Sequence, residues 1–246
     1  IKLPQYAGYN PNLNPNITNE FSTSAFRIGH TLVNSKVIRM DPETGDIALG
    51  GNLDLRFAFF NPLQLKADGP CIYIKGATKQ RVQFFDRMLI DDLRNFLFGA
   101  PGSGGNDLAS INIMRARERG VPDFNTIREN LGLEAYNSFD ELNTDPNTSQ
   151  KLSDIYLGDL NRIDSWVGIL AEEPMENSIF GETTVEILLR QFLALRDGDR
   201  FYFQIDPVLT LDDKREILNT SLADVLMRNT CMENMSDSVL FYDDDQ

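Results

Sequence analysis

Apolar residues recur at helical spacing in several segments of the sequence, most clearly in residues 180–196. The positions expected to face inward there are Val185, Leu188, Leu189, Phe192 and Leu195. Residues 79–98 carry a similar stripe and are expected to form one helix, which the stretch GAPGSGG at 99–105 ends. Its apolar positions are Val82, Phe85, Met88, Leu89, Leu93, Phe96 and Leu97.

Two further helices are predicted closer to the residues that carry chemistry. Thr18 or Asn19 can cap a helix whose apolar residues follow at i, i+4, i+7 and i+11. These apolar residues are Phe21, Ala25, Ile28 and Leu32. The other helix begins after Asn106 or Asp107 and stops at Gly120, a residue that commonly ends helices.

Short helices and long loops fill the rest of the chain. Helical patterns also fit residues 124–132, 138–143, 149–158, 160–170, 212–219 and 221–228. An extended arm is expected at 1–18, and residues 41–78 are turn-rich, with short strands or helical turns. No repeat or linker interrupts the pattern, so residues 1–246 are expected to belong to one mainly α domain with an acidic tail at 240–246. Long loops in such a domain usually accompany a cofactor or a partner chain.

Charge and composition exclude several classes of function. The chain has 246 residues and a net charge of −14, which argues against binding to nucleic acids and to anionic membranes. No apolar run approaches the roughly 20 residues of a membrane span. There is one histidine, His30, so metal sites built from two or three histidines are excluded within these residues. The two cysteines, Cys71 and Cys231, form neither a disulfide framework nor a CxxC zinc site.

His30 is the first candidate for chemistry. A histidine among apolar helix positions is usually a core residue, and that reading stays open here. Gly29 removes a side chain beside the imidazole, so a flat group could approach the backbone closely. Arg27 lies one turn before His30, where it could meet an anionic group. This combination suits haem, with the imidazole on the iron and the arginine on a propionate. Thiolate ligation by Cys71 or Cys231 is the competing option.

The segment 106–120 holds the second set of candidates. Asn112 is either an ordinary buried amide or the acceptor that a metal-bound histidine needs for its other N–H group. Arg115, Arg117 and Arg119 are either a solvated face with acidic partners such as Asp107 or Glu118, or a cluster of which at least one member points inward.

At this point the sequence resembles the animal-type haem peroxidases, the myeloperoxidase and peroxinectin group of the peroxidase–cyclooxygenase superfamily. The similar segments are YAGYNPNLNPNITNEF (6–21), FSTSAFRIGHTLV (21–33), DLASINIMRARERGVPDFN (107–125), WVGILAEEP (166–174) and FGETTVEILLRQFLALRDGDRFYF (180–203). They occur in the family's order and cover nearly all of the chain.

The resemblance implies a role for each matching residue. His30 matches the proximal histidine on the haem iron, Asn112 the asparagine that hydrogen-bonds to it, and Arg27 an arginine that reaches a propionate. Arg115 matches an arginine near the proximal edge of the haem. Apolar residues of the proximal face are matched by Leu97, Phe98, Leu108 and Ile111. The RDGDRF segment at 196–201 resembles a structural signature.

Two departures from the family pattern concern individual residues. Residues 117–120 read RERG where the family usually has RDHG, so any role of that histidine is lost. Met227 stands where the vertebrate enzymes have a disulfide cysteine, and Cys231 falls later. The resemblance therefore does not predict vertebrate-type disulfide bracing.

A larger departure concerns the distal side of the haem. In this family the distal histidine, a calcium loop, the distal arginine and the carboxylates that esterify the haem precede the region matched here. Peroxide cleavage needs a base, and the single histidine is already assigned to iron. We therefore expect residues 1–246 to be the proximal half of the haem domain. A companion chain would carry the distal histidine, the covalent haem anchors and calcium.

The function implied is a haem peroxidase that uses hydrogen peroxide to oxidise halide, thiocyanate or phenols. A haem-free or inactive adhesion or matrix protein on the same fold is the alternative. A fatty-acid dioxygenase is disfavoured, because its radical tyrosine would stand at the position of Arg27. The resemblance implies secretion or a secretory granule, and the acceptor sites Asn16, Asn147, Asn219 and Asn234 agree with a glycoprotein.

Overall fold

The computed structural model describes residues 3–100 and 102–241. It is mainly helical, as the sequence predicted, with 46% helix and 3% strand. The chain divides into two compact units. Of the described residues, the first unit contains 3–31, 85–88 and 109–208, and the second contains 32–84, 89–100, 102–108 and 209–241. Most of the expected acidic tail, residues 242–246, lies outside the described residues.

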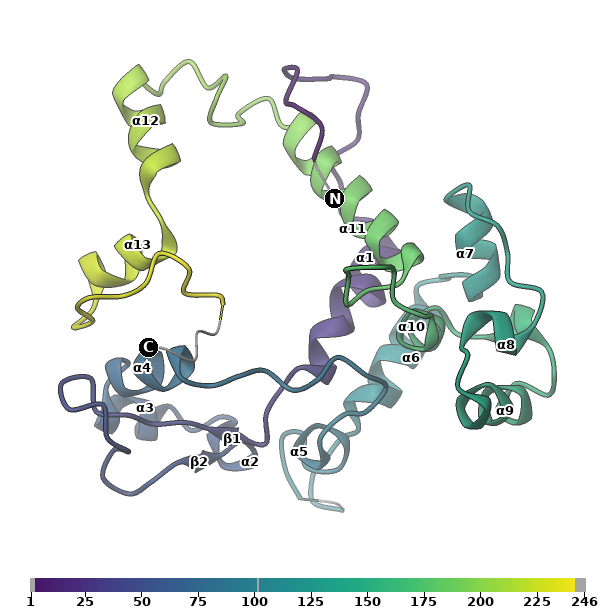
Figure 1. The fold of residues 1–246 in the computed structure, drawn as a ribbon, viewed down its shortest axis with the longest axis horizontal. Helices are drawn as coiled ribbons and strands as arrows, with labels where there is room; N and C mark the ends of the chain where they lie inside the picture. The colour runs from purple at the N-terminus through teal and green to yellow at the C-terminus, as the bar shows by residue number, and fades with distance from the viewer. Residues whose placement is uncertain (1–2, 101, 242–246) are drawn as a thin grey trace. The chain divides into compact units, whose positions relative to one another are not determined.

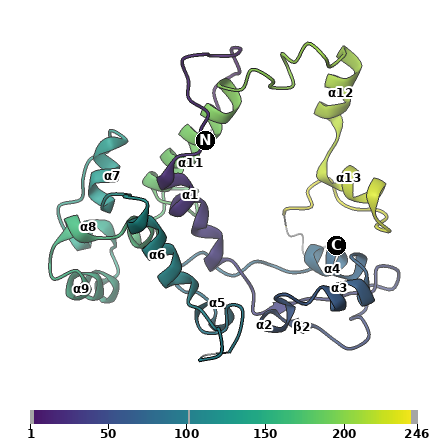
Figure 2. The same ribbon diagram turned by 180° about the vertical axis from the view of Figure 1, so that it is seen from behind.

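In its described residues, the regular elements of the first unit are all helices, joined by irregular segments (Figure 1). Its elements are α1 (Asn19–Thr23), η1 (Ala25–Thr31), α6 (Leu108–Glu118), α7 (Phe124–Asn130), α8 (Phe139–Leu142), α9 (Pro146–Ile155), η2 (Leu160–Arg162), α10 (Ser165–Ala171) and α11 (Glu182–Asp197). α1 packs against α11, η1 packs against α10, and α8 lies beside α9, as Figures 1 and 2 both show for α8 and α9.

The helix expected from residue 18 to residue 32 is divided in two. Thr18 caps α1 as predicted, accepting the backbone N–H of Phe21. Ser24 then leaves the helical conformation, and its buried hydroxyl lies 2.6 Å from the hydroxyl of Ser165. Serine side chains that bond elsewhere compete with helix continuation, so a 3₁₀ helix follows instead of more α-helix. His30 therefore lies in η1, not on an α-helix.

A glycine allows α10 to pack closely against α7 in the core of the first unit. A Cβ atom on Gly168 of α10 would lie 2.2 Å from the ring of Phe124 on α7, which no real side chain tolerates. Trp166 and Phe124 are 3% and 1% exposed, so the contact between α7 and α10 is the centre of this core. Burial of these aromatic side chains supplies much of its stabilisation.

The RDGDRF segment anchors the N-terminal arm. The carbonyl of Asp197 accepts the N–H of Asn10 at 2.7 Å, and the guanidinium of Arg196 donates to the carbonyl of Pro4 at 2.9 Å. Arg196 also lies over the ring of Tyr6. These contacts agree with the structural role that the resemblance assigned to this segment.

The second unit combines short helices with one strand pair. Its elements are β1 (Lys36–Val37), β2 (Leu53–Asp54), α2 (Leu55–Ala58), α3 (Pro62–Asp68), α4 (Cys71–Thr78), α5 (Asp91–Arg94), α12 (Leu211–Asn219) and α13 (Leu222–Asn229). The strands are antiparallel, with Lys36 opposite Asp54. The short strands and helical turns expected in residues 41–78 are therefore present.

The long helix predicted at 79–98 is wrong. Residues 79–90 are irregular, and only α5 is helical. Two contacts account for the difference, because the N–H of Gln83 donates to the carbonyl of Leu32, and buried Asp92 accepts from Arg56 at 2.9 Å. The apolar stripe does not share one buried face either, since Val82 and Met88 are mostly exposed.

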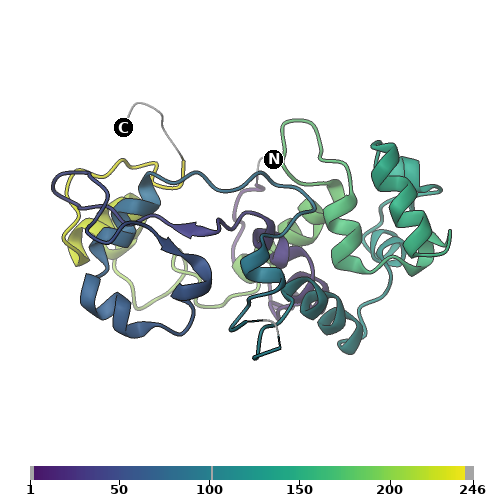
Figure 3. The same cartoon turned by 90° about the horizontal axis from the view of Figure 1, so that it is seen from below.

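A disulfide between Cys71 and Cys231 joins α4 to the segment after α13. The two Cα atoms lie 6.1 Å apart, across a sequence separation of 160 residues. Figure 3 shows the yellow C-terminal segment beside the blue α4. The sequence comparison with vertebrate enzymes did not predict this bridge. Closing so long a loop restricts the unfolded chain strongly.

Candidate functional site

The structure brings His30 and Asn112 into direct contact, although 82 residues separate them. His30 ends η1 and Asn112 lies in α6, and Nδ1 of the imidazole is 2.9 Å from Nδ2 of the amide. Asn112 is 2% exposed, as expected from its apolar neighbours, while His30 is half-buried. Both belong to the first unit. The imidazole is therefore fixed from one side by a buried amide.

The amide atom nearest to the ring differs from the expectation. We expected Oδ1 of Asn112 to accept a proton from the ring, whereas Nδ2 faces Nδ1. With Nδ2 as donor, Nδ1 accepts and the ring proton sits on Nε2. A half-turn of the amide exchanges the two roles without moving either backbone, since an amide presents a donor and an acceptor at equivalent positions. The contact therefore serves both tautomers of the imidazole.

The outer nitrogen of His30 is available to a ligand. Within residues 3–100 and 102–241, Nε2 has no hydrogen-bond partner. A Cβ atom built on Gly29 would meet nothing within 4 Å, so open space lies over the backbone of Gly29, next to His30 in the chain. A flat group can approach the ring here, as the glycine suggested.

Positive charge gathers around this imidazole. Arg27 and His30 are three residues apart in a 3₁₀ helix, where such side chains eclipse one another. Burial and then Arg27 lower the pKa of His30, and burial and then Arg115 lower the pKa of Arg27. Arg27 donates through Nε to the carbonyl of Ser22 at 2.9 Å, and in the described part of the chain neither Arg27 nor Arg115 pairs with a carboxylate. In the described residues, the cluster of His30, Arg27 and Arg115 therefore has no anionic partner.

The arginines of α6 all point outward. Arg115, Arg117 and Arg119 are exposed, so the prediction that one of them points inward is wrong. Arg117 forms a two-pronged ion pair with Asp164, at 2.7 and 2.8 Å, and not with Asp107 or Glu118. The outward orientation leaves Arg115 free to meet a group bound beside Arg27.

The apolar residues assigned by resemblance fall in both units. Leu97 is buried and Leu108 half-buried in the second unit, and Ile111 is half-buried in the first. Phe98 is half-exposed in the second unit and has a φ of 67°, a conformation that bulky residues rarely adopt. It packs against the rings of Phe59 and Phe60. Contacts of these residues with haem stay predictions.

Sequence reasoning missed a buried ionic network in the first unit. Arg128 of α7 is 4% exposed and donates to Glu172, to Oγ1 of Thr183 at 2.8 Å and to Glu182 at 3.0 Å. Its Nε donates to a backbone carbonyl, and its guanidinium lies over the ring of Tyr136, whose hydroxyl donates to Glu172 at 3.1 Å. No spacing in the sequence pairs residues so far apart. The one signal in the sequence is the position of Arg128 on the apolar face of the predicted helix at 124–132, where a charged side chain would need a partner.

The disulfide bears on the choice of metal ligand. Cys71 and Cys231 are joined to each other, so neither offers a free thiolate. Among the described residues, no three His, Cys, Asp or Glu side chains form a group that could hold a metal ion. Nor is any described helix long and apolar enough to cross a membrane.

Comparison with known proteins places this geometry in a family. The family described as Animal haem peroxidase matches residues 1–240. Peroxinectin A from Dictyostelium discoideum is 38% identical over 228 residues, which are 93% of this chain and 42% of that protein. Thyroid peroxidase from Sus scrofa is 34% identical over 94% of this chain and 25% of its own length. The chain therefore spans less than half of these relatives.

Solved structures agree. Peroxidase A from Dictyostelium discoideum superposes with a TM-score of 0.87 at 37% identity, covering 96% of this chain and 45% of that one. A fatty acid alpha-dioxygenase from Arabidopsis thaliana superposes over 76% of this chain with a TM-score of 0.64 at 22% identity, a likeness of fold alone. With the family matched over almost the whole sequence, the chain belongs to the animal haem peroxidases.

Proposed function

We propose that residues 1–246 form the proximal, haem-binding part of a peroxidase that uses hydrogen peroxide to oxidise small donors such as halide, thiocyanate or phenols. The observation that carries the proposal is the contact between His30 and buried Asn112. It holds one ring nitrogen and leaves the other without a hydrogen-bond partner among the described residues, so that nitrogen would be available to hold a haem iron.

The surroundings of His30 fit haem in charge as well. Haem carries two propionates. The imidazole lies near Arg27, which in turn lies near Arg115, and no described carboxylate neutralises either arginine. Charge-assisted hydrogen bonds from guanidinium groups to propionates would complete this cluster. Leu97, Phe98, Leu108 and Ile111 are proposed to contribute apolar contacts to the proximal face.

The tasks of the chain's own residues follow from this arrangement. Bound haem supplies the redox chemistry with peroxide. His30 would hold the iron through Nε2, which would require the ring proton on Nδ1 and thus Oδ1 of Asn112 as acceptor. Because an amide is a neutral acceptor, it orients the ring while leaving the imidazole less anionic than a carboxylate would. Arg27 and Arg115 fix the haem edge.

The distal side of the reaction needs residues that these 246 do not contain. The sequence has one histidine, so a distal acid–base and the covalent haem anchors are proposed to lie on a companion chain, with calcium. Mass spectrometry of the purified protein under denaturing conditions tests this. A separate polypeptide with a distal histidine supports it, and a single longer chain carrying these residues contradicts it.

We propose that the protein is secreted, because its two cysteines are oxidised to a disulfide. The Cys71–Cys231 disulfide is of the kind that persists in oxidising compartments. Asn16, Asn147, Asn219 and Asn234 are all exposed, as glycan acceptors must be. Peptide mapping of secreted material with and without glycosidase checks both points.

An absorption spectrum of the complete protein tests the central proposal. A Soret band and peroxide-dependent oxidation of a donor are expected, and His30→Ala should remove both, by more than about 100-fold in turnover, since even changes behind a ligand cost roughly 10–100-fold. A purified protein without a Soret band would favour the adhesion or matrix alternative. The matched control is Glu118→Gln, an exposed change on α6.

A further inference from the structure

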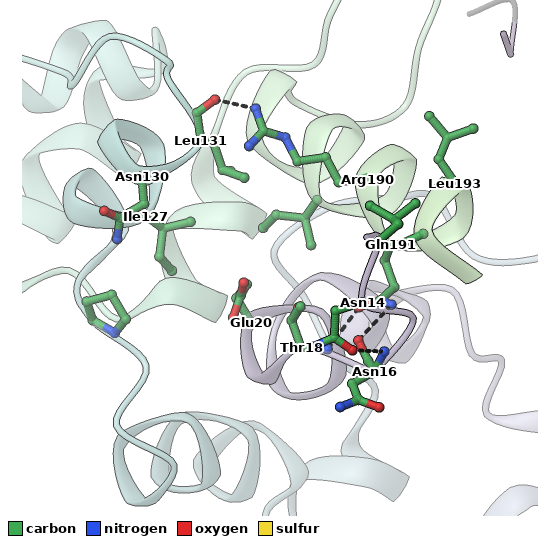
Figure 4. Close-up of a pocket in the computed structure, with 14 residues that line it drawn as sticks. Asn14, Asn16, Thr18, Glu20, Ile127, Asn130, Leu131, Arg190, Gln191 and Leu193 are labelled. Carbon is green, nitrogen blue, oxygen red and sulfur yellow. Dashed lines mark hydrogen bonds between the residues drawn. The ribbon is translucent and has the colours of Figure 1, made fainter. Parts of the chain in front are cut away.

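A cavity of about 530 Å³ lies in the first unit between the N-terminal arm, α7 and α11 (Figure 4). It is distinct from the site at His30, because none of Arg27, His30, Asn112 and Arg115 lines it. Thr18 and Glu20 line it at the start of α1, and His30 is ten residues beyond Glu20, at the far end of η1.

The walls of the cavity are mainly apolar. Ile127 of α7 and Ile187 of α11 line it and are each 3% exposed. Further apolar side chains complete the lining: Leu13, Pro122, Leu131, Leu193 and Ala194. A volume of this size falls within the roughly 300–1,000 Å³ of small-molecule sites. The body of a ligand here would be apolar.

Most polar groups at the rim are already engaged. Oε1 of Gln191 accepts the N–H of Thr18 at 2.9 Å, and its Nε2 donates to the carbonyl of Asn16 at 3.2 Å (Figure 4). Arg190 donates to Glu186 and to the carbonyl of Leu131, each at 2.6 Å. These bonds tie the arm, α7 and α11 together and give the rim a fixed shape.

Among the charged groups that line the cavity, the carboxylate of Glu20 is the exception. It lines the cavity, and within residues 3–100 and 102–241 it has neither a hydrogen bond nor an ion pair. Figure 4 shows it between Ile127 and Gln191, across the cavity from Arg190. Because Glu186 already neutralises Arg190, the charge left for a ligand to match is negative.

We propose that this cavity binds a small amphiphilic cation, an ammonium group carried on an aromatic or branched aliphatic body. The ammonium pairs with Glu20, and the body packs on Ile127 and Ile187. The site is separate from the proposed haem site and does not depend on it. It would give the protein a second small-molecule ligand, recognised by charge complementarity and apolar burial.

Calorimetric titration of the complete protein with phenethylammonium tests the site. Saturable binding is expected with a Kd on the order of 1 mM, which is typical of a ligand as small as phenethylammonium. Phenylacetate, of the same shape and opposite charge, should bind at least about tenfold more weakly. No saturation by phenethylammonium, or equal affinity for phenylacetate, would overturn the proposal.

Two substitutions locate the binding. Glu20→Gln should weaken phenethylammonium about fivefold, the effect of one partly exposed ion pair, and should leave the neutral probe phenethyl alcohol unaffected. Ala194→Phe fills the cavity and should abolish binding of both probes. Glu118→Gln is the control for a carboxylate elsewhere on the unit. Unchanged binding of phenethylammonium in Glu20→Gln or in Ala194→Phe contradicts the site, and thermal unfolding of each variant verifies its fold.

Discussion

Two polar clusters of the first unit differ in how far their charges are satisfied. Around Arg128, a buried guanidinium meets Glu172, Glu182, a hydroxyl and a carbonyl, so each of its donor groups is used. Around His30, Arg27 and Arg115 have no carboxylate partner in the described part of the chain. The first cluster is closed and the second is open.

The difference separates structure from function. A buried charge is tolerated only with partners, so the closed cluster holds α7, α10 and α11 together and needs no ligand. The open cluster gathers cations beside an imidazole, an arrangement that costs free energy unless an anion joins it. The closed cluster should respond to substitution in stability, and the open one in haem binding.

The largest effect is expected in the closed cluster. Arg128→Ala leaves Glu172 buried and unpaired, and should lower the free energy of unfolding by about 3–5 kcal/mol in urea denaturation of the complete protein. Haem-free unfolding curves avoid any contribution from ligand loss.

A double substitution sharpens this test. Arg128→Met with Glu172→Leu removes both charges, so its loss should be smaller than that of Arg128→Ala. Arg215→Ala, which breaks an exposed ion pair with Asp212, should cost less than about 1 kcal/mol. If Arg128→Ala costs no more than Arg215→Ala, the network does not stabilise the unit.

Arg27 should affect haem retention and leave stability nearly unchanged. A propionate that loses its charged partner costs about 1.5–3 kcal/mol, so Arg27→Ala should release haem roughly ten- to hundredfold faster. Transfer of haem to an apo-myoglobin acceptor measures the rate. Arg27→Lys keeps the charge and should restore part of the retention, whereas Arg119→Ala, at an exposed position just after α6, should have no effect. Equal release rates in all four proteins would contradict the contact.

Asn112 should act through the ring of His30. Asn112→Leu leaves the imidazole N–H unpaired and should weaken haem binding by about 1–3 kcal/mol. Asn112→Asp offers a stronger acceptor, which makes the imidazole more anionic and should lower the ferric/ferrous potential. Spectroelectrochemical titration measures both variants. An unmoved potential in Asn112→Asp would make the residue an ordinary buried amide.

The smallest expected effect is a pH dependence in the closed cluster. Burial, and then the charge of Glu172, raise the pKa of Tyr136 well above its usual value of about 10. The folded state therefore keeps a proton that the unfolded state loses, and the stability from Tyr136 is present below pH 10 and falls above it. The loss should be about 1 kcal/mol per pH unit in this half-buried setting.

Comparison with Tyr136→Phe isolates this effect from the other tyrosines. The stability difference between the two proteins should shrink as the pH rises from about 10 to about 11.5. A stability difference that does not change with pH would show that Tyr136 has the same pKa in the folded and the unfolded protein.

The sequence by itself determined the family, the mainly helical class, a helix cap at Thr18 or Asn19, the end of α6 near Gly120 and the extent of α11. It also paired His30 with Asn112 through the resemblance, and the structure places them 2.9 Å apart. These features depend on local chemistry or on a motif, which a sequence displays directly.

Only the tertiary structure decided the rest. The stripe at 79–98 has helical period, yet Asp92 and Gln83 bond to distant residues and leave only α5 helical. The break at Ser24, the Cys71–Cys231 bridge and the Arg128 network likewise depend on partners far along the chain. Periodicity reports which side chains prefer burial, but long-range hydrogen bonds and charge pairs determine which backbone conformation satisfies them.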